Sequence, residues 1–351
     1  VVKFNSKKYQ VPCFYINHVG AQTELIFDGG SMIGNPDGEI ADEMKYFEED
    51  FSVYELEDVA NSKLKHEEKQ ASKMELIHDA LVLGVKDYFG KLGFDKAIIG
   101  LSGGIDSAVT TVLADDALGA ENVRVILMPS QFSSSHSVDD SLELCKNLGI
   151  HQDTISIKEV FEEFQDKLKP VFKDLPFGLA EENIQARIRG TLLMALSNKF
   201  GNILLNTSNK SEAAVGYGTL YGDMNGGLSV IGDVYKTQVY ELANYINRNS
   251  EIIPQNIIDK PPSAELRPDQ KDSDSLPEYE DLDEILYHYI EKREGPKEII
   301  AMGYDKELVL RILKLVNTSE YKRYQTPPML RVSPKAFGMG RRMPIVGKYL
   351  S

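Results

Sequence analysis

Short apolar runs alternate with longer segments of helical periodicity through most of the chain. The runs at 97–101, 123–128, 154–157 and 202–206 have the length and composition of buried strands. Apolar residues that recur every three to four positions predict helices over 74–92, 107–116, 137–148, 181–199 and 234–247. Ser137 and Asp140 fit a capping pattern at the start of one of these helices. The alternation predicts an α/β fold with a doubly wound, Rossmann-like parallel sheet, whose ligands bind at the carboxyl ends of the strands.

The first 57 residues follow a different pattern. Aromatic and β-branched residues predict strands at 11–17 and 24–27, and 51–57 is expected to be one further strand. The stretch 58–72 is charged and lacks an apolar stripe, which is typical of a linker or a solvated helix. We therefore expect a short N-terminal β-rich segment (1–57), a linker (58–72) and an α/β domain (73–351).

Composition and charge narrow the class of protein. The chain of 351 residues is 42% hydrophobic and 26% charged, as in soluble globular proteins, and no apolar run approaches the roughly 18 residues that span a bilayer. A net charge of −15 argues against nucleic acid as a partner. Two cysteines provide no disulfide framework and favour a reducing, cytoplasmic location.

The segment Ser102-Gly103-Gly104-Ile105-Asp106-Ser107 carries the clearest chemical signal. It lies where an apolar strand turns into a helix, so that its glycines let backbone N–H groups approach an anion at a helix N-terminus. It is not a Walker loop, because no Gly-Lys-Ser/Thr follows, and it lacks the second half of a dinucleotide fingerprint. Asp106 would repel phosphate unless a cation intervened, which favours a Mg²⁺ ligand. The alternative is a tight turn with incidental serines.

A second polar stretch, TSNKSE at 207–212 followed by 216–223, comes directly after the predicted strand 202–206. Most such Ser/Thr/Gly-rich connections are structural. At the carboxyl end of a parallel strand, however, this one can face the loop at 102–107. It then supplies a second carboxylate for Mg²⁺, Glu212, while Lys210 and Lys236 are candidate cations for a departing pyrophosphate.

These motifs resemble those of known enzymes. SGGxDS after an apolar strand resembles the pyrophosphate loop of the ATP-pyrophosphatase superfamily, which cleaves ATP between the α- and β-phosphates and adenylates a substrate oxygen. TSNKSE, GYGTLYGDMNGGL and DVYKTQVYELANYIN resemble the synthetase domain of glutamine-dependent NAD⁺ synthetases, as do NIQARIR at 183–189, PSAEL at 262–266 and the basic stretch 320–344. Residues 1–55 resemble the last strands of the nitrilase-like glutaminase domain that is fused to such synthetases.

The resemblance implies ATP-dependent amidation of deamido-NAD⁺ through an acyl-adenylate, with release of AMP and pyrophosphate. Ammonia would come from glutamine in the full-length protein, Mg²⁺ would be held by Asp106 and Glu212, and the enzyme would be a homodimer or a higher homo-oligomer. Asp223 matches a residue that takes a proton from ammonium, although a plain turn aspartate is an equal alternative, and Lys236 would assist catalysis at the phosphates. The implied ATP and pyrophosphate contacts are Ser102, Gly103, Gly104, Asp106, Ser107, Thr207, Lys236 and Ser263. The implied deamido-NAD⁺ contacts are Asn183, Glu212 and Lys322, with Arg187, Arg189 and Tyr321 as weaker candidates.

Three further expectations follow. In the resembled glutaminase domain the nucleophilic cysteine lies upstream of this segment, so Cys13 is expected to be a buried strand residue and residues 1–351 to use ammonia but not glutamine. The polar segment 263–277 is expected to be a mobile lid, or else a surface linker. The rival functions are another ATP-pyrophosphatase amidoligase and a non-catalytic ATP-binding module.

Overall fold

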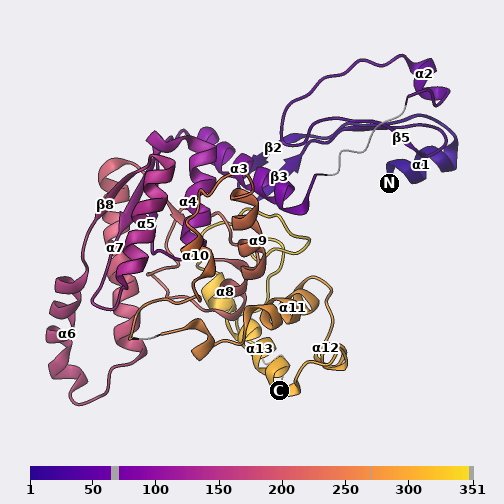
Figure 1. The fold of residues 1–351 in the computed structure, drawn as a ribbon. Helices are drawn as coiled ribbons and strands as arrows, with labels where there is room; N and C mark the ends of the chain where they lie inside the picture. Colours follow the sequence, from indigo (N-terminus) through magenta and orange to yellow (C-terminus); the bar gives the residue numbers. More distant parts are fainter. Residues whose placement is uncertain (65–70, 269, 348–351) are drawn as a thin grey trace.

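A five-stranded parallel sheet forms the centre of the computed structural model, which describes residues 1–64, 71–268 and 270–347 (Figure 1). From one edge to the other, its strands are β10 (Leu228–Ser229), β9 (Ile203–Asn206), β6 (Ala97–Gly100), β7 (Val123–Leu127) and β8 (His151–Thr154). All neighbouring pairs are parallel. The predicted doubly wound sheet is confirmed. After β6 the chain places β7 and β8 on one side of it and then β9 and β10 on the other, so the strand order reverses between β6 and β9.

Helices cover both faces of the sheet because successive strand residues point to opposite sides. Ile99 packs in one apolar cluster and Ile98 in another. The first cluster is covered by α3 (Lys73–Leu92), α4 (Ile105–Leu118), α5 (Ser135–Leu148), α9 (Lys236–Ile246) and α10 (Gln255–Asp259). The second is covered by α6 (Lys158–Phe172) and α7 (Leu179–Phe200).

A second group of helices packs beside the sheet, and its members after residue 278 are orange to yellow in Figure 1. Its members are α8 (Lys210–Val215), α11 (Tyr279–Ile290), α12 (Pro296–Ala301), α13 (Lys306–Thr318) and α14 (Glu320–Arg323). Leu282 and Ile312 are fully buried in the apolar cluster that α8, α11, α12 and α13 share. The chain then returns to the sheet edge, where Met329 bridges to Ser229.

The N-terminal residues form an arm that extends from the α/β body (Figure 1). It contains α1 (Val2–Tyr9) and an antiparallel sheet of β1 (Cys13–Tyr15), β4 (Met32–Gly34) and β5 (Ile40–Glu43). The hairpin of β2 (Val19–Gln22) and β3 (Leu25–Asp28) attaches the arm to α3, where the Asp87 carboxylate accepts the Ala21 N–H at 2.6 Å. The predicted β-rich segment is confirmed, with a helix before it that was not expected.

Several predicted boundaries are wrong. Residues 51–55 form no strand, since Phe51 is 84% exposed and has no sheet to join, and α2 (Leu56–Ala60) follows. Part of the predicted linker, 65–70, lies outside the described residues. Strand β8 lies at 151–154 rather than 154–157, because that register pairs it with β7. The cap of α5 is Ser134, which accepts the Ser137 N–H at 3.1 Å, whereas the predicted capping residues Ser137 and Asp140 are both buried within the helix.

Several elements were not predicted within the α/β body. They include α6, β10 and the short turn η1 (Ala120–Asn122) before β7, and also the helices α8, α10, α12, α13 and α14. A further short turn, η2 (Asp272–Asp274), lies in the segment before α11. Among the helices of the described ranges, none is both long and apolar enough to cross a lipid bilayer.

Candidate active site

A cavity of about 280 Å³ opens at the carboxyl ends of β6, β7 and β9, where the strand order reverses. This is the usual ligand position in an open α/β sheet. The loops after the three strands and the segment 260–266 form its wall. The structure brings together in this cavity most of the residues predicted for ATP, metal and catalysis: Ser102, Gly104, Asp106, Ser107, Thr207, Glu212, Asp223, Lys236 and Ser263, with Arg189.

The loop at 102–107 is held by its own serines. Ser107 Oγ accepts the Ser102 N–H at 3.2 Å and donates to the Gly104 carbonyl at 2.9 Å. Gly103 has a φ of +79°, and a Cβ there would lie 2.4 Å from the Ser137 carbonyl oxygen, so that glycine is required for this close approach. Helix α4 begins at Ile105 without a side-chain cap in the described structure, which leaves first-turn N–H groups for an anion.

Asp106, Lys236 and Glu212 form a charged cluster in the cavity wall. The Lys236 ammonium forms an ion pair with the Asp106 carboxylate, which also accepts the Asn209 side-chain N–H at 3.0 Å. Asn209 caps α8: its side-chain oxygen accepts the Glu212 N–H at 2.9 Å, while the Glu212 carboxylate accepts the Asn209 N–H at 3.2 Å. This capping box fixes the Glu212 carboxylate beside the pair.

The cluster has an excess of negative charge. Burial, reinforced by the nearby Asp106 carboxylate, raises the pKa of Glu212 well above its usual value. Burial lowers the pKa of Lys236, but the attraction of Asp106 and Glu212 outweighs it and the pKa lies above its usual range. Lys236 therefore stays positively charged, whereas Glu212 favours its protonated form until another cation arrives.

Asp272 is a cavity residue that the sequence analysis missed. Its buried carboxylate accepts hydrogen bonds from the hydroxyls of Tyr279 at 3.0 Å and Tyr217 at 3.2 Å. Burial raises the pKa of Asp272, and the charge of Lys236 opposes that rise. No local motif marks Asp272, because it is the fold of the 263–277 segment that brings it toward Lys236.

Asp223 lies at the end of the 216–223 loop and faces the same cavity. Its carboxylate accepts the Thr219 N–H at 2.6 Å. The side chain is reachable from solvent but surrounded by protein, and this enclosure raises the pKa of Asp223 to about 6 although Thr219 and Lys322 oppose the rise. Such a value lets the carboxylate change its protonation state near neutral pH.

Two predicted deamido-NAD⁺ contacts hold that loop and lie outside the described lining of the large cavity. The Asn183 side-chain oxygen accepts the Thr219 hydroxyl at 2.7 Å. Lys322 donates to the carbonyls of Gly216 at 2.8 Å and Gly218 at 2.7 Å, and it lines a smaller cavity that shares Glu212 with the large one. The other two, Arg187 and Tyr321, are exposed and lie outside the described lining of both cavities.

The structure corrects two predictions from the sequence. Lys210 is fully buried and forms ion pairs with Asp233 at 3.0 Å and Glu291 at 2.8 Å, which directs its ammonium away from the described cavity lining and leaves it unavailable to pyrophosphate. Cys13 does lie in a strand, β1, but it is half-buried rather than buried, because this sheet belongs to the arm and not to the main core.

The comparisons with known proteins agree with this arrangement. The family model described as NAD synthase matches residues 77–326, which cover the whole sheet and the cavity. The chain belongs to the NAD synthase family. A glutamine-dependent NAD(+) synthetase of Synechocystis sp. is 52% identical over 348 residues, which are 98% of this chain and 62% of that protein. The chain thus spans less than two thirds of the length of this relative.

Two solved structures extend the comparison. The glutamine-dependent NAD⁺ synthetase of Acinetobacter baumannii in complex with ADP is 42% identical with a TM-score of 0.69, over 98% of this chain and 63% of that one. The NH3-dependent NAD synthetase of Campylobacter jejuni, in complex with nitrate, is 28% identical with a TM-score of 0.58. The match covers 72% of the present chain and 96% of the Campylobacter protein.

Proposed function

We propose that this chain is a ligase that amidates deamido-NAD⁺ to NAD⁺ and converts ATP to AMP and pyrophosphate. The observation that carries the proposal is the convergence of the 102–107 loop, Lys236 and two carboxylates on one cavity at the reversal point of the sheet. The names of the relatives support the same activity, and the likeness to an NH3-dependent enzyme over 96% of that protein supports ammonia as the nitrogen source for residues 1–351.

In the first step, the nicotinate carboxylate of deamido-NAD⁺ attacks the α-phosphorus of ATP, and pyrophosphate leaves. Charge accumulates on the phosphoryl oxygens, so the protein acts mainly by positioning and by electrostatic stabilisation. Backbone N–H groups of the 102–107 loop hold the pyrophosphate, and the Lys236 ammonium neutralises it as it departs. Thr207 and Ser263 line the same cavity, and we assign them contacts with the nucleotide.

The residues present fit a magnesium ion that arrives with ATP. Within the described part of the chain no group of three or more His, Cys, Asp or Glu side chains is suited to a metal, but Mg²⁺ commonly uses one or two carboxylates together with substrate phosphates and waters. Asp106 and Glu212 supply that pair, because Asn209 both binds the Asp106 carboxylate and forms the capping box that holds Glu212. Bound there, Mg²⁺ supplies charge stabilisation at the phosphates.

In the second step, ammonia attacks the acyl-adenylate, which releases AMP and gives NAD⁺. The attacking species is neutral NH₃, so a base that takes a proton from ammonium assists the step. Asp223 faces the cavity and has a pKa of about 6, which suits this task at neutral pH.

We expect the contribution of Asp223 to depend on pH. The carboxylate is the active form, so the ratio of wild-type kcat/KM for ammonia to that of Asp223→Asn should rise as the pH increases through about 6. Above about pH 7.5 the ratio should level off at roughly 10². Taking the ratio cancels the effect of pH on free ammonia, and the side-chain oxygen of the substituted asparagine can still accept the Thr219 N–H. A ratio that stays constant between about pH 5 and pH 8 would rule out Asp223 as the base.

The proposal is tested by NAD⁺ formation from ATP, Mg²⁺ and deamido-NAD⁺ with either ammonia or ammonia-free glutamine as the nitrogen donor. We expect ammonia to support turnover and glutamine to fail, because Cys145 is buried with its pKa raised to about 11 and Cys13 is the first residue of β1, where it pairs with Gly34. Cys13→Ala should leave ammonia-dependent synthesis unchanged. Glutamine-driven synthesis that is lost in Cys13→Ala would make Cys13 the nucleophile.

The same assay separates the rival functions. Another amidoligase of the superfamily would release pyrophosphate only with a different acid in place of deamido-NAD⁺, and a non-catalytic module would bind ATP without releasing pyrophosphate. We extend the proposal to an N-terminal glutaminase-like segment over 1–57, a linker over 58–72, a synthetase domain over 73–351, a homo-oligomeric assembly and a cytoplasmic location.

A further inference from the structure

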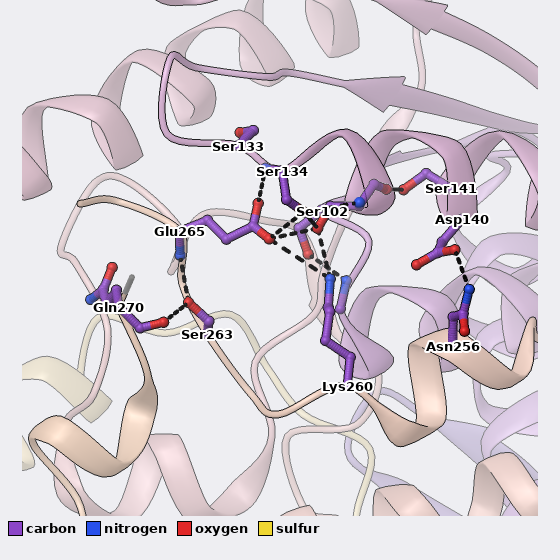
Figure 2. A network of polar contacts seen from close by, with 12 residues as sticks. Ser102, Ser133, Ser134, Asp140, Ser141, Asn256, Lys260, Ser263, Glu265 and Gln270 are labelled. Atoms are coloured by element: carbon purple, nitrogen blue, oxygen red, sulfur yellow. Dashed lines mark hydrogen bonds and ion pairs between the residues drawn. The ribbon is translucent and has the colours of Figure 1, made fainter. Parts of the chain in front are cut away.

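Glu265 connects the cavity-lining segment 260–266 to helix α5. Its carboxylate accepts the Ser134 N–H at 3.2 Å, the Ser134 hydroxyl at 3.1 Å and the Ser137 hydroxyl at 2.6 Å. Lys260 donates to the Ser137 hydroxyl oxygen at 2.7 Å and lies 3.8 Å from the Glu265 carboxylate. Figure 2 shows Glu265 pointing from its segment toward Ser134 and Lys260.

The first turn of α5 links this group to the phosphate loop. Gly103 lies so close to Ser137 that an added Cβ would be 2.4 Å from the Ser137 carbonyl oxygen and 2.8 Å from its Cα. A displacement of Ser137 therefore changes the space available to the loop at 102–107. The same serine contacts both Glu265 and Lys260, so the loop and the 260–266 segment share one point of attachment.

On the segment side, the backbone of Glu265 is held in an unfavourable conformation. Its φ is +48°, in the left-handed region that a glutamate rarely adopts and that persists only where the surroundings fix it. The Glu265 N–H donates to the Ser263 hydroxyl oxygen at 3.1 Å, and that hydroxyl donates to the Gln270 carbonyl at 2.6 Å. The position of Ser263 thus depends on the conformation of Glu265.

We propose that Glu265 is a positioning residue, whose contacts with α5 hold Ser263 and Lys260 in register with the phosphate loop so that the triphosphate of ATP can bind. This inference rests on the proposed function for the identity of the nucleotide. The Glu265 carboxylate is satisfied by the first turn of α5, two hydroxyls and Lys260, so that it does not repel the polyanion that enters the cavity. We call the contacts of the Glu265 carboxylate with Ser134, Ser137 and Lys260 the Glu265 latch.

The first test is Glu265→Gln. Glutamine has the same size, but it carries an N–H₂ group that cannot accept from the Ser134 N–H, and it is not attracted by Lys260. We expect KM for ATP to rise by about tenfold, as for the loss of a charge-assisted hydrogen bond, while KM for deamido-NAD⁺ stays the same. Partial unfolding alone would lower the active fraction, and thus the apparent kcat, and would leave both KM values unchanged.

Ser137→Ala removes the α5 hydroxyl that contacts both Glu265 and Lys260, and it should give the same selective rise in KM for ATP. In the double variant Glu265→Gln/Ser137→Ala, KM for ATP should be no higher than in the more affected single variant, because the effects of substitutions within one hydrogen-bond network are not additive. Glu278→Gln is the matched control, since Glu278 is an exposed carboxylate just before α11 and should leave both KM values unchanged.

A second readout does not depend on turnover. Without substrates, subtilisin should cleave residues 261–268 about tenfold faster in Glu265→Gln and Ser137→Ala than in the wild type or Glu278→Gln, since local opening of the released segment exposes it. Any of three results would contradict the proposed role of Glu265: unchanged cleavage, a KM for ATP within about twofold of wild type, or equal rises in both KM values. If Glu265→Gln fails to fold, Ser137→Ala decides alone. If the wild type does not amidate deamido-NAD⁺, the proposed function is wrong. The Glu265 latch is then still tested by the rate of subtilisin cleavage and by the affinity for Mg·ATP, measured by calorimetry in the wild type and in the variants.

Discussion

Asp106→Asn is expected to lower kcat for NAD⁺ formation by about 10²–10³ while the protein stays folded. Asp106 lies in the first turn of α4 and is half-buried, and its carboxylate contacts Lys236 and Asn209. Asparagine keeps the size of the side chain and can still accept from Asn209. It removes the negative charge that orients Lys236 and that, with Glu212, would hold Mg²⁺ against the phosphates.

The measurement is steady-state kinetics at saturating Mg²⁺, with a thermal melt to verify folding. Asp116→Asn is the matched control, because Asp116 lies on the same helix and pairs at 3.0 Å with His78, away from the described cavity lining. It should retain wild-type turnover. Near-wild-type turnover in Asp106→Asn would remove this carboxylate from the mechanism.

Lys236→Gln is expected to have a comparable effect on kcat, about 10²–10³, because the buried cation that neutralises the departing pyrophosphate is lost. It should also lower the free energy of unfolding by roughly 3–5 kcal/mol, since the Asp106 carboxylate loses the buried cation with which it is paired. Urea denaturation measures the second effect separately from the first.

A single-turnover experiment on the folded fraction locates the defect in Lys236→Gln. Release of pyrophosphate should slow in parallel with formation of NAD⁺. The exposed residue Lys271, in the segment before α11, provides the control Lys271→Gln, which should release pyrophosphate at the wild-type rate. Normal pyrophosphate release with slow NAD⁺ formation would move Lys236 to the ammonia step and contradict its role in neutralising the departing pyrophosphate.

The sheet could be predicted because three of its strands, β6, β7 and β9, are apolar runs that stand out from the sequence around them. Strand β10 has two residues and pairs only through the register of β9, so no local pattern marks it. Helix α6 has a helical pattern of apolar residues in its sequence, because Phe161, Phe164 and Leu168 recur at helical spacing. The register of β8 depends on its partner β7 and not on its own composition.

The site divides in the same way. Asp106 and Glu212 could be predicted because each follows the end of a parallel strand, and parallel strands end at one edge of the sheet. Asp272 and Glu265 could not, since tertiary contacts bring Asp272 to the hydroxyls of Tyr217 and Tyr279 and bring Glu265 to α5. Lys210 was assigned wrongly because its charge and its position in TSNKSE do not reveal that Asp233 and Glu291 are buried beside it.

The central claim is that the carboxylate of deamido-NAD⁺ becomes adenylated before ammonia attacks. The most direct measurement uses deamido-NAD⁺ with a heavy oxygen isotope in both carboxylate oxygens, together with ATP, Mg²⁺ and ammonia. Because the attacking carboxylate oxygen stays on the α-phosphorus, we predict one labelled oxygen in AMP for each NAD⁺ formed. Unlabelled AMP, or label in inorganic phosphate together with ADP, would contradict the adenylate and the roles assigned to the loop at 102–107 and Lys236.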